Sequence, residues 1–283
     1  AYAGVDACAA LYVSWADFYH QKQDFVSEMK VIEEGIKRYP SSEFTADLKD
    51  KQRIVCMPSL SVQVTHPYPQ TEAELRVTSK NLKGATLEWY RLNLKASSSV
   101  FAQNLEHADL IKKYGTLVDK VRLDLPDTPT YKDTVSLLTS RMPEAGIYIL
   151  KSIPDGYQDK IGYDVVHLSA LQVVPFPMEG RKTECHVVDC KTGKPVAGAE
   201  LVFYSIPVPG NYTLYKMFKT DKQGKVVVPD MKESLWMHAR AGKDEFMQVA
   251  YWSRRVLPTV NDSKKKVDRM DLYPMSFIEF LAA

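Results

Sequence analysis

The residues best suited to chemistry lie between positions 185 and 190, where Cys185 and His186 are followed by Cys190. Cysteine and histidine bind zinc, but a structural zinc site uses a Cys-x-x-Cys pair with a second pair of ligands elsewhere. The alternating pattern here predicts a strand, and at about 3.3 Å per residue the two sulfurs would be roughly 16 Å apart. A disulfide needs Cα atoms within about 7 Å, so a bond between these two cysteines would require the strand to break. We expect Cys185 to be a core residue and Cys190 to lie at the strand end; pairing of Cys190 or Cys56 with another cysteine stays open.

The other residues that could support catalysis do not form a recognisable site. Six histidines are spread along the chain without a shared motif spacing: His20, His66, His107, His167, His186 and His238. The chain contains no Gly-x-Ser-x-Gly elbow, no His-Glu-x-x-His helix and no phosphate-binding loop. Asp221 and Asp230 lie near a predicted turn, but two carboxylates are too few for calcium, which takes about six to eight oxygens. We therefore predict no catalytic residue, no metal site and no cofactor, and expect that the chain is not an enzyme.

The composition is that of an ordinary globular protein, with 45% hydrophobic and 25% charged residues among 283. At about 150 residues per domain, this length predicts two domains. The 37 Lys and Arg nearly balance the 35 Asp and Glu, and a net charge of +2 is too small to attract nucleic acid or an anionic membrane. No apolar run approaches the roughly 18 residues of a membrane span. The chain begins at Ala1 without Met or a signal segment, so we expect a processed form or an excised fragment.

Helical periodicity dominates residues 5–39. Apolar residues recur there every three or four positions: Leu11, Trp15, Phe18, Tyr19, Phe25, Met29, Ile32 and Ile36. Polar residues at 20–24 predict a turn between two antiparallel helices, and Pro40 ends the second helix. The pair resembles one tetratricopeptide-type repeat through Trp15, Ala16, Tyr19, Ile32, Gly35 and Pro40. An equal alternative is the last hairpin of a helical domain that continues upstream, because one pair cannot bury its own apolar face. We assign residues 1–50 to this hairpin.

The period changes from 3.6 to 2 after residue 52, which predicts strands. Leu60, Val62 and Val64 alternate with polar residues. Further strands fit residues 74–78, 86–94, 121–125, 131–138, 147–153 and 165–174, and residues 103–114 fit a helix. Because helices are not interleaved between the strands, the pattern favours an antiparallel sandwich over a parallel α/β fold. We place this first sandwich at residues 51–178, with a linker from Pro175 to Gly180 at its end.

A second set of strands follows, at residues 182–188, 200–206, 213–219, 225–228, 234–241 and 245–252. Tight turns that require a positive φ contain Gly193, Gly198 and Gly224. Three tryptophans fall in predicted strands of the two sandwiches, where we expect them to be buried between sheets: Trp89, Trp236 and Trp252. We place the second sandwich at residues 179–256 and a linker or truncated tail at residues 257–283. The predicted fold class is mainly β, with two consecutive immunoglobulin-like antiparallel sandwiches preceded by the helical hairpin.

The second sandwich carries a family resemblance. Residues 184–204, followed by Thr-Asp-Lys-Gln-Gly at 220–224, resemble a seven-stranded immunoglobulin-like module. This module occurs in bacterial alpha-2-macroglobulin-like proteins and, in a close variant, in carboxypeptidase regulatory-like domains. Residues 74–92, 121–126 and 143–150 favour the first family, because they look like the macroglobulin-like domain that precedes the module there. The resemblance covers nearly the whole chain and rests on the order and spacing of these segments.

The resemblance implies a role but no site residue. Trapping members of the family use a Cys-Gly-Glu-Gln thioester and a bait region further downstream, and no cysteine here stands in such a run. In the family the chain continues past the second sandwich into a further strand. Here residues 269–274 are followed by Met275-Ser-Phe instead of the rest of that strand, so we expect either a truncated chain or a short relative. The resemblance implies a non-catalytic scaffold portion of an extracytoplasmic endopeptidase inhibitor, in the periplasm or at the outer cell surface. Its implied partners are proteases or other domains of the parent protein, and the oligomeric state stays open.

Two further hypotheses stand beside the scaffold. One is a cell-surface binding or adhesion module of the carboxypeptidase regulatory-like type, which recognises glycan or protein. The other is an enzyme with a cryptic site, which would need a deep pocket with two converging titratable groups. A binding module would expose aromatic side chains on the first sandwich, whereas a scaffold would bury Trp89, Tyr90 and Tyr148 between sheets or domains.

Overall fold

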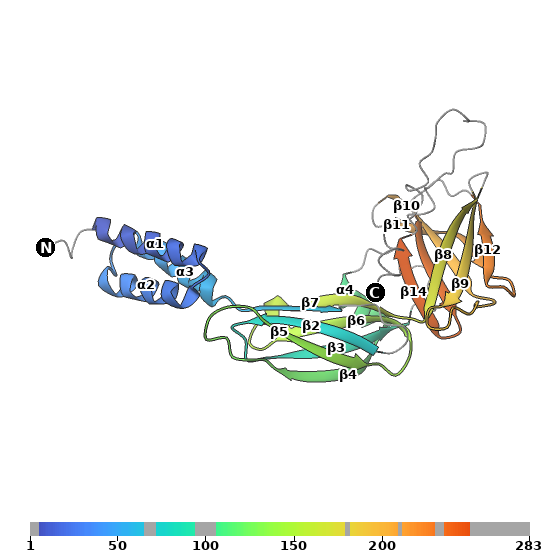
Figure 1. Cartoon of the computed structure of the whole chain (residues 1–283), viewed down its shortest axis with the longest axis horizontal. Coiled ribbons are helices and arrows are strands. Elements are labelled where there is room, and N and C mark those ends of the chain that lie inside the picture. The colour runs from blue at the N-terminus through green and yellow to red at the C-terminus, as the bar shows by residue number, and fades with distance from the viewer. Residues whose placement is uncertain are drawn as a thin grey trace, which may run out of the picture.

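The computed structural model describes residues 6–64, 72–93, 106–178, 182–208, 211–229 and 235–249. In Figure 1 the N-terminal helices, a first pair of sheets and a second pair of sheets follow one another along the long axis of the molecule. The order along the chain is thus also the order along the molecule. No helix in the described ranges is both long enough and apolar enough to cross a membrane.

The helical part that the structure describes consists of α1 (Asp6–Gln21), α2 (Phe25–Arg38) and α3 (Thr45–Cys56). α1 and α2 form the predicted hairpin, and they are separated at the predicted polar stretch. Asp24 caps α2, because its carboxylate accepts a hydrogen bond from the backbone N–H of Ser27 at 3.1 Å. The buried core between the helices contains Ala16, Met29, Ile32, Leu48 and Val55.

α3 corrects the expectation of a two-helix hairpin. The sequence of α3 is largely polar, and its buried residues are Thr45, Leu48 and Val55. Leu48 and Val55 are two helical turns apart, so they share one face and close the core between α1 and α2. Two apolar residues at this spacing are too few to mark an amphipathic helix in the sequence. The helical part therefore continues to Cys56, beyond the expected boundary at residue 50.

Two antiparallel sheets face each other in the first sandwich. The order β1-β2-β5 is formed by β1 (Ser59–Val64), β2 (Glu72–Lys80) and β5 (Thr134–Arg141). The order β4-β3-β6-β7 is formed by β4 (Gly115–Asp124), β3 (Gly84–Leu92), β6 (Gly146–Pro154) and β7 (Gly162–Leu168). The helix α4 (His107–Tyr114) precedes β4, within the helix predicted at residues 103–114. The core between the sheets contains Leu75, Val77, Leu87, Trp89, Tyr148 and Leu150.

The second sandwich has the same plan. One sheet has the order β12-β9-β8, from β12 (Lys225–Val228), β9 (Lys182–Asp189) and β8 (Leu171–Met178). The other has the order β11-β10-β13-β14, from β11 (Asn211–Lys219), β10 (Glu200–Val208), β13 (Leu235–Ala241) and β14 (Asp244–Val249). Its core contains Val173, Cys185, Val187, Leu201, Phe203, Met237 and Phe246. The predicted mainly β class with two consecutive sandwiches is confirmed.

The strand predicted at residues 165–174 is two strands that belong to different sandwiches. β7 ends at Leu168 and pairs with β6, whereas β8 begins at Leu171 and pairs with β9. The predicted linker residues Pro175 and Pro177 lie in β8, where they are tolerated because β8 is an edge strand. The chain therefore passes from one sandwich to the next at residues 169–170.

The predicted turn at 220–224 is confirmed, and its glycine is required. Gly224 has φ +70, and a Cβ there would lie 2.7 Å from the carbonyl oxygen of Val187. The Asp221 carboxylate accepts the backbone N–H groups of Gln223 at 2.8 Å and Lys225 at 2.9 Å. This carboxylate therefore stabilises the turn. Several predicted positions lie outside the described residues: His66, Gly180, Asp230, Trp252 and the tail at residues 257–283.

Candidate functional site

The cysteine and histidine cluster does not form a ligand site. Cys185 is fully buried on the inner face of β9, and this burial raises the pKa of its thiol to about 12. His186 points to the other face, where its Nε2 lies 2.5 Å from a carboxylate oxygen of Glu184. Cys190 follows the last residue of β9, as predicted. No disulfide joins the cysteines, all of which lie in the described ranges, and no group of ligating side chains in those ranges could hold a metal.

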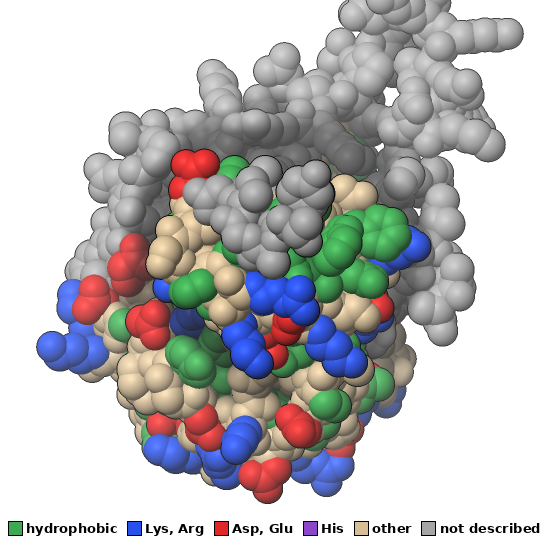
Figure 2. Space-filling view, turned by 90° about the vertical axis from the view of Figure 1, so that its left-hand side faces the viewer, with side chains coloured by type: hydrophobic (Ala, Val, Ile, Leu, Met, Phe, Trp, Pro, Cys, Tyr) green, Lys and Arg blue, Asp and Glu red, His purple; other side chains and the backbone are tan. Residues whose placement is uncertain are grey.

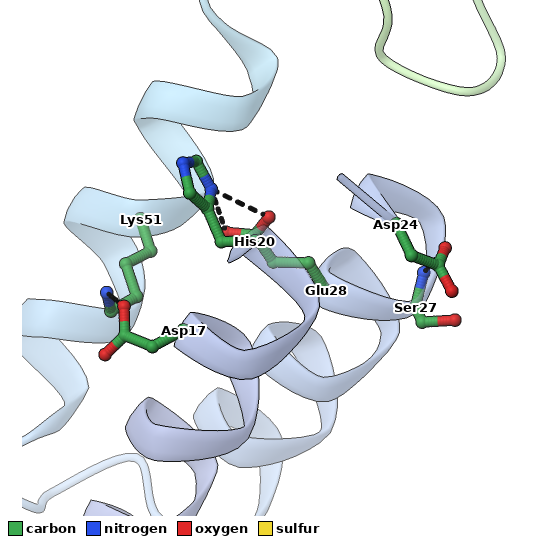
Figure 3. Close-up of polar contacts among 6 residues, drawn as sticks. All are labelled: Asp17, His20, Asp24, Ser27, Glu28 and Lys51. Carbon is green, nitrogen blue, oxygen red and sulfur yellow. Dashed lines mark hydrogen bonds and ion pairs between the residues drawn. The ribbon is translucent and has the colours of Figure 1, made fainter. Parts of the chain in front are cut away.

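In the helical part, polar side chains tie the three helices together (Figure 3). Asp17 on α1 forms an ion pair with Lys51 on α3. The His20 ring at the end of α1 lies 3.0 Å from a carboxylate oxygen of Glu28 on α2. Glu28 is 1% exposed, and burial raises the pKa of its carboxyl group although His20 acts in the opposite direction. These contacts hold helices in place and bring no reactive group into a pocket.

Of the three aromatic residues expected to be buried in the first sandwich, Trp89 and Tyr148 are buried and Tyr90 is half-buried. Trp89 and Tyr148 are both fully buried, with ring centroids 6.2 Å apart in an edge-to-face arrangement. The Tyr148 hydroxyl donates to the backbone carbonyl of Glu144 at 2.5 Å. Tyr90 lies on the other face of β3, half-buried, and its hydroxyl donates to Glu88 at 2.8 Å. Burial and this carboxylate raise the pKa of Tyr90 to about 12.

The apolar side chains on the outer face of β3 and β6 are covered by other elements. Leu92, Ile147 and Ile149 are nearly or fully buried, although they point away from the core between the two sheets. They pack against α4 and against Met247 of β14, which belongs to the second sandwich. β14 contacts β6 and β7, and in Figure 1 it stands across the end of the first sandwich. The edge strand of the second sandwich therefore covers these side chains together with α4, and we call the region where the two sandwiches meet the sandwich junction.

Polar contacts flank the apolar part of the sandwich junction. The Arg91 guanidinium donates to the carbonyls of Ala145 at 3.1 Å and Lys243 at 3.4 Å, which joins the two sandwiches. Lys243 forms an ion pair with Glu144 at 2.6 Å, and this contact lowers the pKa of the Glu144 carboxyl group. The Asp244 carboxylate accepts the backbone N–H of Ala170 at 2.9 Å. The turn between β13 and β14 is thus bonded to the end of the first sandwich.

A buried histidine and glutamate lie beside this contact. His238 on β13 and Glu245 on β14 are 1% and 2% exposed, and their side chains approach to 2.9 Å. His167 on β7 belongs to the first sandwich and lies on the same face as Ile147, with which it pairs. Burial, with the nearby His238, lowers the pKa of His167 to about 4, so its ring is neutral at neutral pH. The sandwich junction therefore brings His167 of the first sandwich near the buried His238 and Glu245 of the second.

Sequence reasoning found none of the residues of the sandwich junction. His167, His238 and Glu245 are distant in the sequence, and no motif spacing connects them. One signal was present: the run Gly-Ile-Tyr-Ile-Leu in β6 is apolar at consecutive positions, which is typical of a strand covered on both faces. That run predicts a cover on the outer face but does not identify it.

The helical part is joined to the first sandwich by a second set of contacts. The Asn81 side-chain amide donates to the carbonyl of Val55 at 2.9 Å, and the Lys160 ammonium donates to the carbonyl of Pro58 at 3.2 Å. Tyr131, from the segment before β5, packs into the core of the helices. The outer face of α1 stays open, with half-exposed side chains at Leu11, Trp15 and Phe18. Figure 2, the view onto this end, shows hydrophobic side chains among charged ones.

Comparison with solved structures supports the predicted resemblance at the level of the fold. The crystal structure of native alpha-2-macroglobulin from Escherichia coli spanning domains MG0-NIE-MG1 matches with a TM-score of 0.53 and 18% identity, over 68% of this chain and 64% of that one. A Salmonella alpha-2-macroglobulin mutant matches with a TM-score of 0.50 and 17% identity, over 74% of this chain and 13% of that one. The chain therefore spans 64% of the first of these chains and 13% of the second. No protein-family model and no curated protein matches the chain.

Proposed function

We propose that the chain is the non-catalytic N-terminal scaffold portion of a bacterial alpha-2-macroglobulin-like endopeptidase inhibitor, located in the periplasm or at the outer cell surface. The observation that carries this proposal is the sandwich junction. Met247 on the edge strand β14 of the second sandwich packs, together with α4, on Ile147 and Ile149 of the first, and the ion pair between Lys243 and Glu144 lies beside this contact. Such a junction holds two modules in one relative position, which is what a structural wall requires.

The mechanism that this role implies is mechanical. An inhibitor that traps a protease after bait cleavage needs walls that keep their shape while other parts move. Apolar burial on both faces of β6 resists separation, because opening the junction would expose Ile147, Ile149 and Met247 to water. The contacts of Asn81 and Tyr131 give the helical part a fixed place at the other end of the first sandwich. The chain contributes position and rigidity, and the reactive parts lie elsewhere in the parent protein.

The alternative of a surface-binding module lacks the feature that would favour it. Glycan and protein recognition by a sandwich uses exposed aromatic side chains gathered on one face. Trp89 and Tyr148 are instead buried between the sheets. Within the described parts of the two sandwiches, the exposed large aromatic side chains are Tyr157 and Phe176, which belong to different sandwiches.

An inhibition assay with trypsin and elastase tests this role. The chain alone should leave both proteases active at equimolar concentration, because the proposal places the bait and reactive parts outside it. A complete polypeptide that carries the chain should retain the cleaving protease in a complex of high mass, while the protease still hydrolyses small substrates. Stoichiometric inhibition by the chain alone, or a complete polypeptide that is cleaved without retaining protease, would contradict the proposal.

A further inference from the structure

β5 is the end strand of its sheet and carries exposed apolar side chains. In the described part of the chain it pairs with β2 alone, so its other edge presents unpaired backbone groups. Leu137 is 64% exposed and Val135 is 48% exposed, and both point to the outer face of the sheet. Leu137 has the largest exposed fraction among the large hydrophobic residues that the structure describes. An apolar strip therefore runs beside an open strand edge.

The open edge of β5 lacks the usual protection against pairing with another chain. Folded proteins guard such edges with charges, prolines or bulges. The strand reads Thr-Val-Ser-Leu-Leu-Thr-Ser from Thr134, without a charge, proline or glycine until Arg141. Its register with β2 is continuous and has no bulge. This edge is therefore suited to receive a further strand.

We propose that β5 pairs antiparallel with β5 of a second copy of the chain, about a two-fold axis through Leu137. About this axis, a residue a given number of positions before Leu137 lies opposite the partner residue the same number of positions after it. Leu137 itself therefore packs against the partner's Leu137. The same register sets Val135 opposite the partner's Thr139. It also sets Asp133 opposite the partner's Arg141, and the symmetry repeats this pair on the other side. Both ends of the strand then carry an opposite-charge pair, and Val135, Leu137 and Thr139 of the two copies fill the middle.

Neighbouring registers fit less well. Moving the register by one residue turns every side chain of the partner strand to the opposite face of the sheet. Val135 and Leu137 of the two copies would then lie on opposite faces and would not meet. A two-fold axis through Leu138 would set Val135 opposite the partner's Arg141. An axis through Ser136 would set Leu137 opposite the partner's Val135 but would leave Asp133 opposite the partner's Thr139, without a charge to pair with. The axis through Leu137 sets Leu137 against the partner's Leu137 and, of the three axes, is the one that also pairs acid with base.

The groups at the two ends of β5 are available for this contact. Arg141 already forms an ion pair with Glu72 on β2, but a guanidinium has five donors and can serve a second carboxylate. The Asp133 carboxylate accepts a 3.5 Å hydrogen bond from the Ser59 hydroxyl and is otherwise exposed. One pair of short strands is smaller than the roughly 1,600 Å² of a standard interface, so the dimer should be weak. We expect a micromolar dissociation constant.

Sedimentation equilibrium of the full chain at about 5 to 300 µM tests the dimer. Leu137→Lys places two ammonium groups against each other on the axis, and should weaken the dimer at least about tenfold. The matched control is Leu117→Lys on β4, the edge strand of the other sheet, where Leu117 is 48% exposed. This control should leave the dissociation constant unchanged. Far-UV circular dichroism checks that both variants keep the wild-type fold.

Charge reversal and cross-linking test the register. Asp133→Arg should weaken the dimer, and adding Arg141→Asp should restore it, because the pairs then have the opposite polarity. Paired residues on antiparallel strands have Cα atoms about 4.5 to 5.5 Å apart, within reach of a disulfide. Leu137→Cys should therefore form a cross-linked dimer under mild oxidation, with the exposed Cys56 removed by Cys56→Ser.

Several results would overturn the inference. A wild-type chain that stays monomeric up to about 300 µM would show that the edge of β5 does not receive a second copy, and is left for a strand of another polypeptide. An unchanged dimer in Leu137→Lys, an equal loss in Leu117→Lys or a failure of the double charge reversal to restore pairing would each exclude this interface. None of these results depends on protease inhibition, so the dimer and the scaffold role can fail separately.

Discussion

Lowering the pH from about 7 to about 5 should destabilise the sandwich junction through His167. This side chain is held neutral in the folded protein, where its pKa is about 4, whereas an unperturbed histidine has a pKa of 6.5. As the pH falls below 6.5, the unfolded chain binds a proton that the folded chain rejects until about pH 4. The free energy of unfolding therefore falls with the pH in this window and reaches its full loss below the folded pKa.

The size of the loss follows from the difference between the two pKa values. One pKa unit corresponds to about 1.4 kcal/mol, so the loss is about 2 kcal/mol at pH 5 and about 3 kcal/mol at pH 4. The His167 ring is only half-buried, and water that reaches it reduces these values. We therefore expect a loss of about 1 to 2 kcal/mol between pH 7 and pH 5. The nearby His238 acts on His167 in the same direction as burial, and His238 is itself paired with Glu245.

Urea unfolding of the full chain at about pH 7, 6 and 5, followed by circular dichroism, measures this loss. His167→Gln keeps a polar side chain of similar length without the titration, so its stability should fall less between pH 7 and pH 5 than that of the wild type. The matched control is Ile147→Val, in the residue that pairs with His167 across β6 and β7. It should lower stability by about 1 kcal/mol at every pH without changing the slope.

The comparison has a clear negative outcome. If His167→Gln lost as much stability as the wild type between pH 7 and pH 5, the acid sensitivity would come from other groups. If Ile147→Val also flattened the pH dependence, the slope would report general weakening of the sandwich junction. Either result would refute the assignment of the proton uptake to His167.

Three further predictions concern the core, the sandwich junction and the cysteines. Trp89→Ala empties a fully buried site between the sheets and should lower the free energy of unfolding by about 3 to 5 kcal/mol, measured by urea unfolding; a loss under about 1 kcal/mol would contradict the intersheet position. Met247→Asp places a carboxylate on the apolar outer face of β6 and should separate the two sandwiches, seen as a larger radius of gyration in small-angle X-ray scattering. An unchanged radius would mean that Met247 does not hold the sandwich junction. In the native chain, iodoacetamide should alkylate the exposed Cys56 well before the buried Cys185, whose thiol has a pKa of about 12; equal labelling by mass spectrometry would contradict that burial.

Local patterns predicted most of the strands because they depend on neighbouring residues only. Leu75 and Val77 alternate with polar neighbours, and β2 buries them on one face. The turn at Gly224 was predicted for a similar reason, since a positive φ is a property of a single residue. The burial of Trp89 followed from its place in a strand of a sandwich, but the same expectation was wrong for Trp236, which is half-buried on the face of β13 opposite the core.

The misplaced elements depend on contacts that are distant in the sequence. α3 has few apolar residues, and it is stabilised as a helix by packing against α1 and α2. β7 and β8 read as one apolar run, because the run itself does not say with which strand each half pairs. β8 pairs with β9 of the second sandwich, and that pairing moves the boundary between the sandwiches.

The amino-acid sequence by itself determined the helical start, the change to alternating strands, the turns and the mainly β class, because hydrophobic period and backbone preferences act over a few residues. Only the tertiary structure decided which strands share a sheet and where one sandwich ends. It also decided that Met247 covers Ile147 and Ile149, and that a histidine from one sandwich faces a histidine–glutamate pair in the other. Those features arise when apolar faces of strands that are distant in the sequence pack together and exclude water. The spacing of residues within one strand does not determine which other strand will cover its face.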